Sequence, residues 1–333
     1  MLDILCIGDS VIDIFLKIPE ANPNFKLEDS GKKLLMNLGE KISLEKYILD
    51  IGGNATNTSV GISRFGFNVG LCAEIGQDEF SAKIINRLKE ENINRNFLRQ
   101  TPEAKTSFSV ILNYGGERTI FSEHVLREHN FDFEPLETKF IYLTSLGNKW
   151  EEAYKKTLNF VINKKPILAF NPGTLQIEKK DKLIMDIIEI SDYLFLNKEE
   201  AEEILYGKEL DLETKDRKQV FKKLLFGLKS LGAKNVIITD SDNGSYACDN
   251  SGKAYFLGTV KSQVIEKTGA GDSFAAGFIS ALIEGLSLQE AMVFGAINAA
   301  SVIEKIGALE GLLDKKQLLE KLNSLKNFIP VEF

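Results

Sequence analysis

The chain has 333 residues, 44% of them hydrophobic and 27% charged, and this globular composition excludes wholesale disorder while allowing two domains, or one large α/β domain with an appendage. Its 41 Lys and Arg residues against 48 Asp and Glu residues give a net charge of −7, which argues against nucleic acid and an anionic membrane as partners. The three cysteines form no C-x-x-C motif, which excludes a disulfide scaffold and a thiolate zinc site, and the two histidines are too few for a histidine-based metal centre.

The first residues, MLDILCIG, include Asp3 and lack the basic segment of a secretory signal. The longest apolar stretch, residues 274–283, is about half of the ~20 residues that a membrane-spanning helix needs. We therefore expect a cytoplasmic protein.

Apolar runs that predict strands alternate with helical patterns along most of the chain, as in a doubly wound α/β sheet flanked by helices. In chain order, strands are expected at residues 2–8, 68–73, 140–143, 167–170, 193–196 and 235–240. Helices are expected between them at residues 54–65, 78–91, 150–163 and 215–230. A long helical segment follows at residues 272–303, interrupted at Gly285-Leu286-Ser287.

Two segments break this alternation. Residues 106–121 contain two β-rich runs joined around Gly115-Gly116, which is a hairpin signal, and residues 14–50 end in the strand-like Tyr47-Ile48-Leu49. These irregular strands predict a small β-sheet appendage that covers a site. Ordinary surface hairpins are the alternative.

The segment TGAGD, Thr268 to Asp272, comes directly before the helical pattern AAGFISALI. Its glycines expose backbone N–H groups at the positive end of a helix dipole, where an anion binds readily. Asp272 is then either a helix cap or a base that takes a proton from a hydroxyl attacking a phosphoryl group. The motif alone leaves both interpretations open.

Three further segments place polar groups at predicted strand ends or helix starts. GGNATN (52–57) offers paired glycines for close backbone approach and the amide of Asn57. DSVID (9–13) follows the first strand, where Asp13 can hold two hydroxyls in the crevice at the carboxyl ends of the strands. NKEE (197–200) follows another strand. A glycine turn, a solvated turn aspartate and a charged first helical turn are the simpler explanations.

The sequence lacks the motifs of several other enzyme classes. It has no G-x-x-x-x-G-K-S/T phosphate loop, no G-x-G-x-x-G after the first strand and no G-x-S-x-G elbow. A P-loop enzyme, a dinucleotide-binding dehydrogenase and an α/β-hydrolase are therefore disfavoured.

Four segments, taken in order, resemble the motifs of the PfkB family of carbohydrate kinases, part of the ribokinase-like superfamily that includes nucleoside kinases. They are GDSVID, GGNATNTSVGISRFGFNVGLCAEIG, NKEE and EKTGAGDSFAAGF. The resemblance covers almost the whole chain. It implies one ribokinase-like domain over residues 1–333, with a mainly parallel sheet and a small β-sheet lid inserted from about 14–50 and 104–122. The lid would exclude water and, as often in this family, form a homodimer.

The resemblance also implies transfer of the ATP γ-phosphoryl group to a hydroxyl, with Mg²⁺ bound. Asp272 would be the general base. By the same resemblance, the transferring phosphate would be stabilised by the amides of Gly269, Ala270 and Gly271. The substrate hydroxyls would be held by Asp13, Gly53 and Asn57. Positioning and electrostatics are what phosphoryl transfer mainly requires.

On the nucleotide side, the resemblance implies ATP contacts from Asn197, from Thr239 and Gly244 in a nucleotide loop, and from Asn298 on the adenine side. Glu200 would hold Mg²⁺ through water, consistent with a hard and partly hydrated ion. The loop carries Asp240 and Asp242, two carboxylates that are unfavourable beside phosphate unless they face solvent.

Glu266 stands where several family members have an aspartate that helps to hold a monovalent cation such as K⁺. Here the next residue is Lys267, which brings its own ammonium group. We therefore expect Lys267 to weaken dependence on K⁺.

The resemblance leaves the substrate open between a sugar, as in ribokinase or fructokinase, and a nucleoside. A nucleoside needs an apolar or stacking pocket from the lid, for which the candidates are Phe15, Phe108, Ile111 and Phe121. A phosphorylated sugar needs a basic cluster, for which Lys105 and Arg118 are sparse. The alternative from another class is a non-catalytic regulator that binds a sugar or nucleotide.

Overall fold

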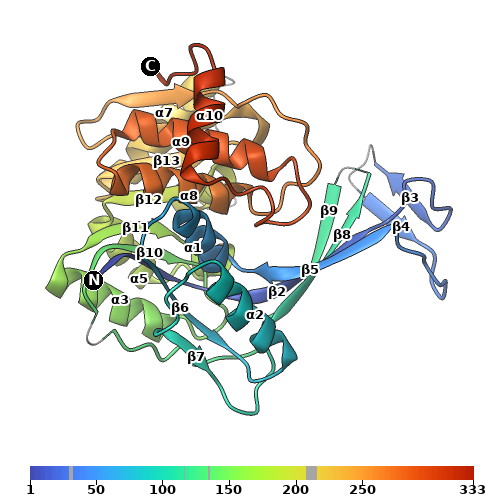
Figure 1. Cartoon of the computed structure of the whole chain (residues 1–333). Coiled ribbons are helices and arrows are strands. Elements are labelled where there is room, and N and C mark those ends of the chain that lie inside the picture. Colours follow the sequence, from blue (N-terminus) through green and yellow to red (C-terminus); the bar gives the residue numbers. More distant parts are fainter. Residues whose placement is uncertain (30–32, 116, 134–135, 208–215) are drawn as a thin grey trace.

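The computed structural model describes residues 1–29, 33–115, 117–133, 136–207 and 216–333. In these residues a ten-stranded sheet forms the centre, in the order β16-β15-β14-β13-β12-β11-β10-β1-β6-β7, and helices cover both of its faces (Figure 1). The strands are β1 (Leu2–Ile7), β6 (Val69–Ile75), β7 (Leu98–Gln100), β10 (Thr138–Thr144), β11 (Ile167–Asn171), β12 (Tyr193–Asn197), β13 (Asn235–Thr239), β14 (Ser245–Cys248), β15 (Ala254–Leu257) and β16 (Val331–Glu332).

Seven neighbouring strands of this sheet, β13, β12, β11, β10, β1, β6 and β7, run parallel to one another. Strands β14, β15 and β16 add an antiparallel edge next to β13. Parallel strands are buried on both faces, which explains why the first strand, LDILCI, is almost continuously apolar. Because side chains alternate along a strand, Ile4 and Cys6 belong to one core and Leu5 and Ile7 to the other. The expected doubly wound, mainly parallel sheet is confirmed.

One core lies between the sheet and α1 (Asn54–Arg64), α2 (Glu79–Glu90), α8 (Ala270–Ile283), α9 (Leu288–Val302) and α10 (Lys315–Ser324). The other core lies under α3 (Glu151–Lys164), α4 (Thr174–Lys179), α5 (Lys182–Ile190), α6 (Lys198–Tyr206) and α7 (Arg217–Ser230). The helical segment expected at 272–303 is two helices, because Gly285 has φ 82° and Ser287 caps α9 in a capping box with Glu290. Residue 215, at the start of one expected helix, lies outside the described residues.

A second sheet of four strands, in the order β5-β2-β8-β9, projects from the main body (Figure 1). Its strands are β2 (Val11–Lys17), β5 (Lys46–Gly52), β8 (Phe108–Tyr114) and β9 (Glu117–Glu123). The hairpin of β3 (Phe25–Glu28) and β4 (Lys33–Met36) lies at its far end. We call these six strands the lid. Gly116, in the expected turn between β8 and β9, lies outside the described residues.

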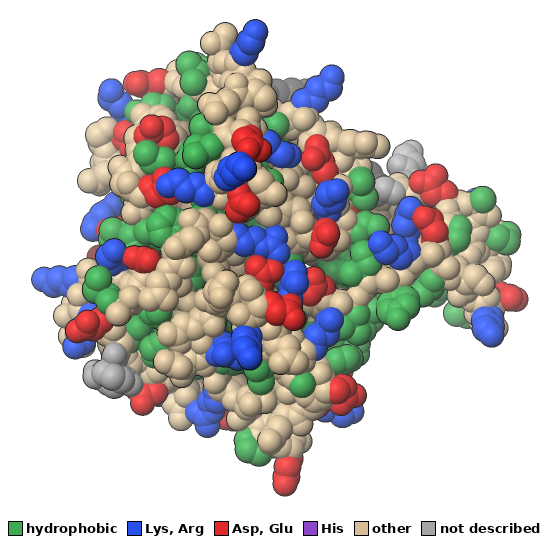
Figure 2. Space-filling model, viewed as in Figure 1, with side chains coloured by type: hydrophobic (Ala, Val, Ile, Leu, Met, Phe, Trp, Pro, Cys, Tyr) green, Lys and Arg blue, Asp and Glu red, His purple; other side chains and the backbone are tan. Residues whose placement is uncertain are grey.

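The lid leaves large apolar side chains exposed, whereas the main body shows mixed charge. Tyr47 and Phe121 are 68% and 57% exposed. On the face shown in Figure 2, acidic and basic side chains are interspersed over the main body, and hydrophobic side chains gather on the lid. None of the helices in the described part of the chain is long and apolar enough to cross a bilayer.

Candidate active site

A cavity of about 290 Å³ lies where the end of β1, the start of α1, the lid and the start of α8 meet. We call it the proximal cavity. Asp13 from lid strand β2 and Asp272 from α8 both line it, together with Gly53, Asn57 and Gly269. The fold therefore brings three of the predicted motifs, which are up to 259 positions apart in the sequence between Asp13 and Asp272, to one place.

Helix α8 begins beside this cavity because Gly269 takes a left-handed N-cap conformation, with φ 77°. A Cβ at Gly269 would lie 2.5 Å from Cβ of Ala308, so only glycine fits. A Cβ at Gly271 would meet nothing within 4 Å, which leaves open space at the helix start. The Ala270 N–H donates to the carbonyl of Lys267 at 3.3 Å, so of the predicted cradle amides Gly271 is better placed to bind an anion.

Asp272 lies in the first turn of α8 and is buried. Its Oδ2 accepts a hydrogen bond from Nδ2 of Asn57 at 2.8 Å, which ties α8 to α1. Burial raises the pKa of Asp272 to about 6, and the bond from Asn57 opposes that shift. A carboxylate that titrates near neutrality, beside the N-terminus of a helix, is suited to accept a proton while a phosphate lies nearby.

Asp13 is held by the glycine pair at the end of β5. A Cβ at Gly52 would lie 2.0 Å from Oδ2 of Asp13, and one at Gly53, whose φ is 94°, would lie 2.4 Å from the carbonyl oxygen of Asp9. Burial, and then the neighbouring charge of Asp272, raise the pKa of Asp13 to about 7. The glycine turn therefore borders the proximal cavity through Gly53.

Asn197 and Glu200 form a reciprocal capping box at the start of α6. The Glu200 N–H donates to Oδ1 of Asn197 at 2.8 Å, and the Asn197 N–H donates to Oε2 of Glu200 at 2.9 Å. Burial raises the pKa of Glu200 to about 7. Glu200 lines a second cavity of about 420 Å³, the distal cavity, from which its carboxylate would hold Mg²⁺ through water.

The predicted nucleotide loop follows β13, and cations partner both of its carboxylates. Asp240 forms an ion pair with Arg217, and Asp242 lies 3.9 Å from Nζ of Lys267. These pairs remove the unfavourable charge expected beside a phosphate. Gly244 has φ 101° and its Cβ would lie 2.1 Å from the carbonyl oxygen of Leu257, so this position also requires glycine.

Asn298 lies away from solvent in α9. Its Nδ2 donates to the carbonyl of Ser273 at 2.7 Å, and its Oδ1 accepts from the Leu313 N–H at 3.1 Å. The adenine contact predicted for Asn298 would have to use the second N–H or the second lone pair of an amide that is fully buried. In this structure it ties α9 to α8 and to the following loop.

Glu266 is buried beside the cradle. Its Oε1 accepts from the Thr268 N–H at 2.7 Å and lies 4.0 Å from Nη1 of Arg118, whereas its Oε2 is buried with no partner among the described residues. An unpartnered buried carboxylate oxygen fits the predicted monovalent cation. Arg118 itself lines the proximal cavity, so the lid supplies a cation to it.

Sequence analysis missed Asp9 and His124, which line both cavities, although Asp9 lies in the strand-end segment that predicted Asp13. His124 follows β9 and carried no motif. Of the apolar candidates for a base pocket, Ile111 lines the proximal cavity, while Phe15 is buried and Phe108 packs against Phe80 at a ring distance of 6.2 Å.

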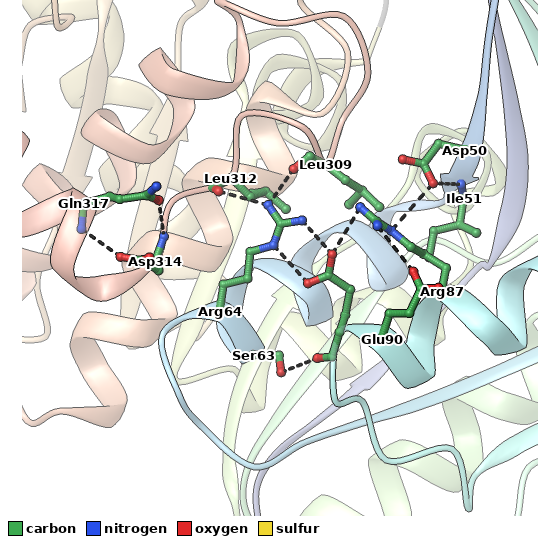
Figure 3. Close-up of polar contacts among 11 residues, drawn as sticks. Asp50, Ile51, Ser63, Arg64, Arg87, Glu90, Leu309, Leu312, Asp314 and Gln317 are labelled. Carbon is green, nitrogen blue, oxygen red and sulfur yellow. Dashed lines mark hydrogen bonds and ion pairs between the residues drawn. The ribbon is translucent and has the colours of Figure 1, made fainter.

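A network of hydrogen bonds and ion pairs connects α1 and α2 to lid strand β5 (Figure 3). Arg64 at the end of α1 donates to the carbonyls of Leu309 and Leu312 at 2.8 and 3.0 Å. Arg64 and Arg87 both contact the carboxylate of Glu91, at 2.6 and 3.2 Å. Arg87 also lies 3.8 Å from Oδ1 of Asp50, the residue that pairs with Asp13 across β5 and β2.

The sequence matches known kinases over nearly its full length. The sequence model described as pfkB family carbohydrate kinase matches residues 2–315. The chain is 26% identical to a nucleoside kinase of Methanocaldococcus jannaschii, with 97% of each chain covered. It is 27% identical to a probable chloroplastic fructokinase of Arabidopsis thaliana, with 81% of this chain and 74% of that one covered.

Solved structures share the fold. A ribokinase of Thermotoga maritima matches with a TM-score of 0.76 and 23% identity, over 97% of this chain and 100% of that one. A ribokinase of Arabidopsis thaliana, complexed with ribose and ATP, matches with a TM-score of 0.74 and 18% identity, over 96% of this chain and 98% of that one. The large sheet and the separate lid sheet are thus those of the ribokinase fold.

Proposed function

Because the chain belongs to the pfkB family of carbohydrate kinases, we propose that it transfers the γ-phosphoryl group of ATP to a hydroxyl of a sugar, in the manner of a ribokinase or fructokinase. The observation that supports this most directly is the proximal cavity. It is lined by two carboxylates, Asp272 and Asp13, and by Gly269 at the start of α8, and a Cβ at the nearby Gly271 would meet only open space.

In the proposed reaction, Asp13, Gly53 and Asn57 hold the hydroxyls of the sugar in the proximal cavity. Asp272 accepts the proton of the reacting hydroxyl as its oxygen attacks the γ-phosphorus and the bond to ADP breaks. The cradle amides at the start of α8 stabilise the charge on the transferring phosphoryl group. Mg²⁺, held through water by Glu200, would neutralise charge on the phosphates.

The lid has two tasks in this proposal. Its strand β9 contacts the cradle segment through Arg118, near Glu266, and through Glu117, 3.9 Å from Nζ of Lys267. A lid held over the cradle excludes water, which would otherwise accept the phosphoryl group. Its guanidinium at Arg118 also adds positive charge to the cavity that receives the phosphate.

A nucleoside kinase is the second candidate, supported by the full-length relative from Methanocaldococcus jannaschii and by the size of the distal cavity. Its weakness is the lack of a stacking surface. Among the described residues that line the two cavities there is no Phe, Tyr or Trp. We therefore place the sugar first.

The test is a coupled assay of ADP release with Mg·ATP and a panel of D-ribose, D-fructose, other free sugars and ribonucleosides. We expect turnover with a free sugar that falls by about 10²–10⁴ in kcat in Asp272→Asn, the usual contribution of a general base. Asp181→Asn is the matched control, because Asp181 caps α5, lines neither cavity, and asparagine caps equally well.

Two results would contradict the proposal. Faster turnover of a ribonucleoside than of any sugar would favour the nucleoside kinase. Ligand-induced thermal stabilisation without any ADP release would favour the non-catalytic regulator.

A further inference from the structure

The chain enters and leaves the lid twice. It first passes from β1 into β2 and from β5 into α1, and later from β7 into β8 and from β9 towards β10. The second passage consists of residues 104–107, which lead into β8, and residues 124–129, which follow β9. We call these two segments the lid root. They connect β9, which carries Arg118, Ile120 and Ser122 into the proximal cavity, to the main body.

The turn after β6 holds the incoming segment of the lid root. Asp78 accepts two hydrogen bonds from Thr106, one from its N–H at 2.7 Å and one from its Oγ1 at 2.6 Å. The Gly76 N–H donates to the same Oγ1 at 3.2 Å, and the Gln77 N–H donates to the carbonyl of Ala104 at 2.9 Å. A Cβ at Gly76 would lie 2.4 Å from that carbonyl oxygen, so the incoming segment packs directly on the backbone of the turn.

Two buried charged side chains hold the outgoing segment. Arg127 is 5% exposed, and its Nη2 donates to the carbonyl of Lys105 in the incoming segment. Glu74, which lies in β6 and is 7% exposed, accepts from the His129 N–H at 2.9 Å through Oε2. These bonds tie the two segments of the lid root to each other and to the central sheet.

Arg127 brings a buried positive charge to the lid root. Burial lowers the pKa of its guanidinium, and the charges of Glu74, Asp78 and Asp9 oppose that shift. The three carboxylates belong to the main body, at or near the ends of β6 and β1. A buried cation is unfavourable unless its compensating charges stay in place, so this arrangement favours one position of the lid root on the sheet.

The lid root also places a residue of the cavities. His124 begins the outgoing segment and lines both cavities, as does Asp9. The next residue, Val125, donates its N–H to Oγ of Ser107 at 3.1 Å. Since His124 is close to Arg127 in the chain and directly follows β9, a displacement of Arg127 would be passed on to the cavity. A misplacement of about 1 Å can lower a reaction rate by roughly a hundredfold.

We propose that Arg127 is a positioning residue for phosphoryl transfer, and that it fixes the lid over the proximal cavity by holding the two segments of the lid root together at the ends of β1 and β6. This inference rests on the proposed function. Arg127 is not among the described residues that line the two cavities, so it acts through β9 and His124 and does not touch the substrate. A lid released at its root would admit water beside the transferring phosphoryl group.

The test needs a variant that keeps the fold. Arg127→Met alone leaves Glu74 buried without this cation and is expected to be strongly destabilised. The double variant Glu74→Gln/Arg127→Met removes both charges at similar volume and keeps an acceptor for the His129 N–H, so it should fold. The control is Arg99→Met. Arg99 donates to the carbonyl of Asn130, beside the lid root, at 2.8 Å, but its side chain is exposed.

The experiment measures KM for both substrates, and the amounts of ADP and of phosphorylated product, with Mg·ATP and the best acceptor of the panel. The wild type and Arg99→Met should form the two products in equal amounts. For the double variant we expect kcat/KM for the acceptor to fall about ten- to a hundredfold, with KM for ATP changed less than about threefold. We also expect it to form more ADP than phosphorylated acceptor, because water competes for the phosphoryl group.

These readouts separate positioning from a purely structural role. A purely structural role would reduce the amount of active enzyme, which lowers kcat but leaves both KM values and the product ratio unchanged. That result, or wild-type kinetics in the double variant, would overturn the inference while leaving the kinase proposal intact. An equal effect of Arg99→Met would overturn it as well.

Amide hydrogen exchange tests the lid root without any substrate, so it decides the inference even if the wild type phosphorylates no acceptor. The N–H groups of Thr106, Val125 and His129 donate in the hydrogen bonds of the lid root. In the double variant these amides should exchange about tenfold faster, or more, while exchange in β11 and β12 stays unchanged. Unchanged exchange in the lid root would overturn the inference.

Discussion

At the scale of single residues, Asp272 and Asp13 show that burying a carboxyl group makes its ionised form less stable. Both carboxyls are buried, and burial is the first cause of their raised pKa values of about 6 and about 7. A protein that needs an ionised base at neutral pH must keep this charge in a poorly solvated place. On the proposed mechanism, these two positions lower the stability of the fold in exchange for a functional charge.

Asp272→Asn is expected to stabilise the fold, and the gain depends on pH. A carboxyl whose folded pKa is raised contributes stability below its unfolded pKa of 3.8, and this contribution is lost as the pH rises through about 6. The neutral variant escapes that loss. Urea unfolding should show a free energy of unfolding higher than that of the wild type by on the order of 2 kcal/mol at pH 8, and little difference at pH 3.5. Equal stabilities at pH 8 would contradict the buried charge.

Glu266 and Lys267 carry a prediction about monovalent cations. The buried Oε2 of Glu266 has no hydrogen-bond partner among the described residues, and the nearby Lys267 ammonium lies 3.9 Å from carboxylate oxygens of Glu117 and Asp242. We expect equal turnover in Na⁺, K⁺ and Tris buffers. A large stimulation by K⁺ in the wild type would show that Lys267 does not replace the ion.

At the scale of elements, the site depends on contacts between parts that are remote in the sequence. Helices α1 and α8 meet through the bond from Asn57 to Asp272, and α1 meets α2 through the ion pair of Arg64 and Glu91. The carboxylate of Glu91 is shared by Arg64 and Arg87. Because Arg87 also contacts Asp50 on β5, this network joins the lid to the main body.

Glu91→Gln is expected to destabilise the protein, because two guanidinium groups lose their shared charge partner. The side chains of Arg64 and Glu91 are 22% and 12% exposed, so the loss should be about 1–3 kcal/mol, less than for a fully buried pair. Urea denaturation measures it. The matched control is Glu320→Gln, which breaks an exposed pair with Lys316 and should change stability by less than about 0.5 kcal/mol. Equal losses would mean that the network is merely a surface contact.

At the scale of the whole molecule, the two faces of the lid sheet differ. The inner face carries Asp13, Ile111 and Ile120, which line the cavity. Side chains alternate along a strand, so Phe121 lies on the opposite face, where it pairs with Val110. The outer face of the lid thus presents apolar side chains such as Phe121 to solvent.

We expect this outer face to form a homodimer, as the family resemblance predicts. Phe121→Glu should then shift the protein from dimer to monomer in size-exclusion chromatography with light scattering, because an unpaired charge would be buried in the interface. The control is Ile329→Glu, at an apolar side chain that is 69% exposed on the main body. A wild-type monomer, or a dimer that survives Phe121→Glu, would contradict this arrangement.

The sequence by itself determined the elements and the reaction class. Continuous apolar runs such as residues 2–7 specify buried parallel strands, and glycine-rich turns before α1 and α8 mark the ends where ligands bind. These signals are local: each depends on residues within one strand or one turn. The order of the motifs along the chain was enough to identify the kinase family.

The tertiary structure alone decided which side chains share a cavity. His124 belongs to no motif, and Asp9 belongs to one that singled out only Asp13; their place beside Asp13 comes from how β1 and the lid pack together. The pKa of Asp272 likewise depends on burial, and the buried position of Asn298, bonded to Ser273 and Leu313, depends on the packing of α9 on α8. Burial and long-range pairing arise when distant segments meet, so no local pattern in the sequence records them.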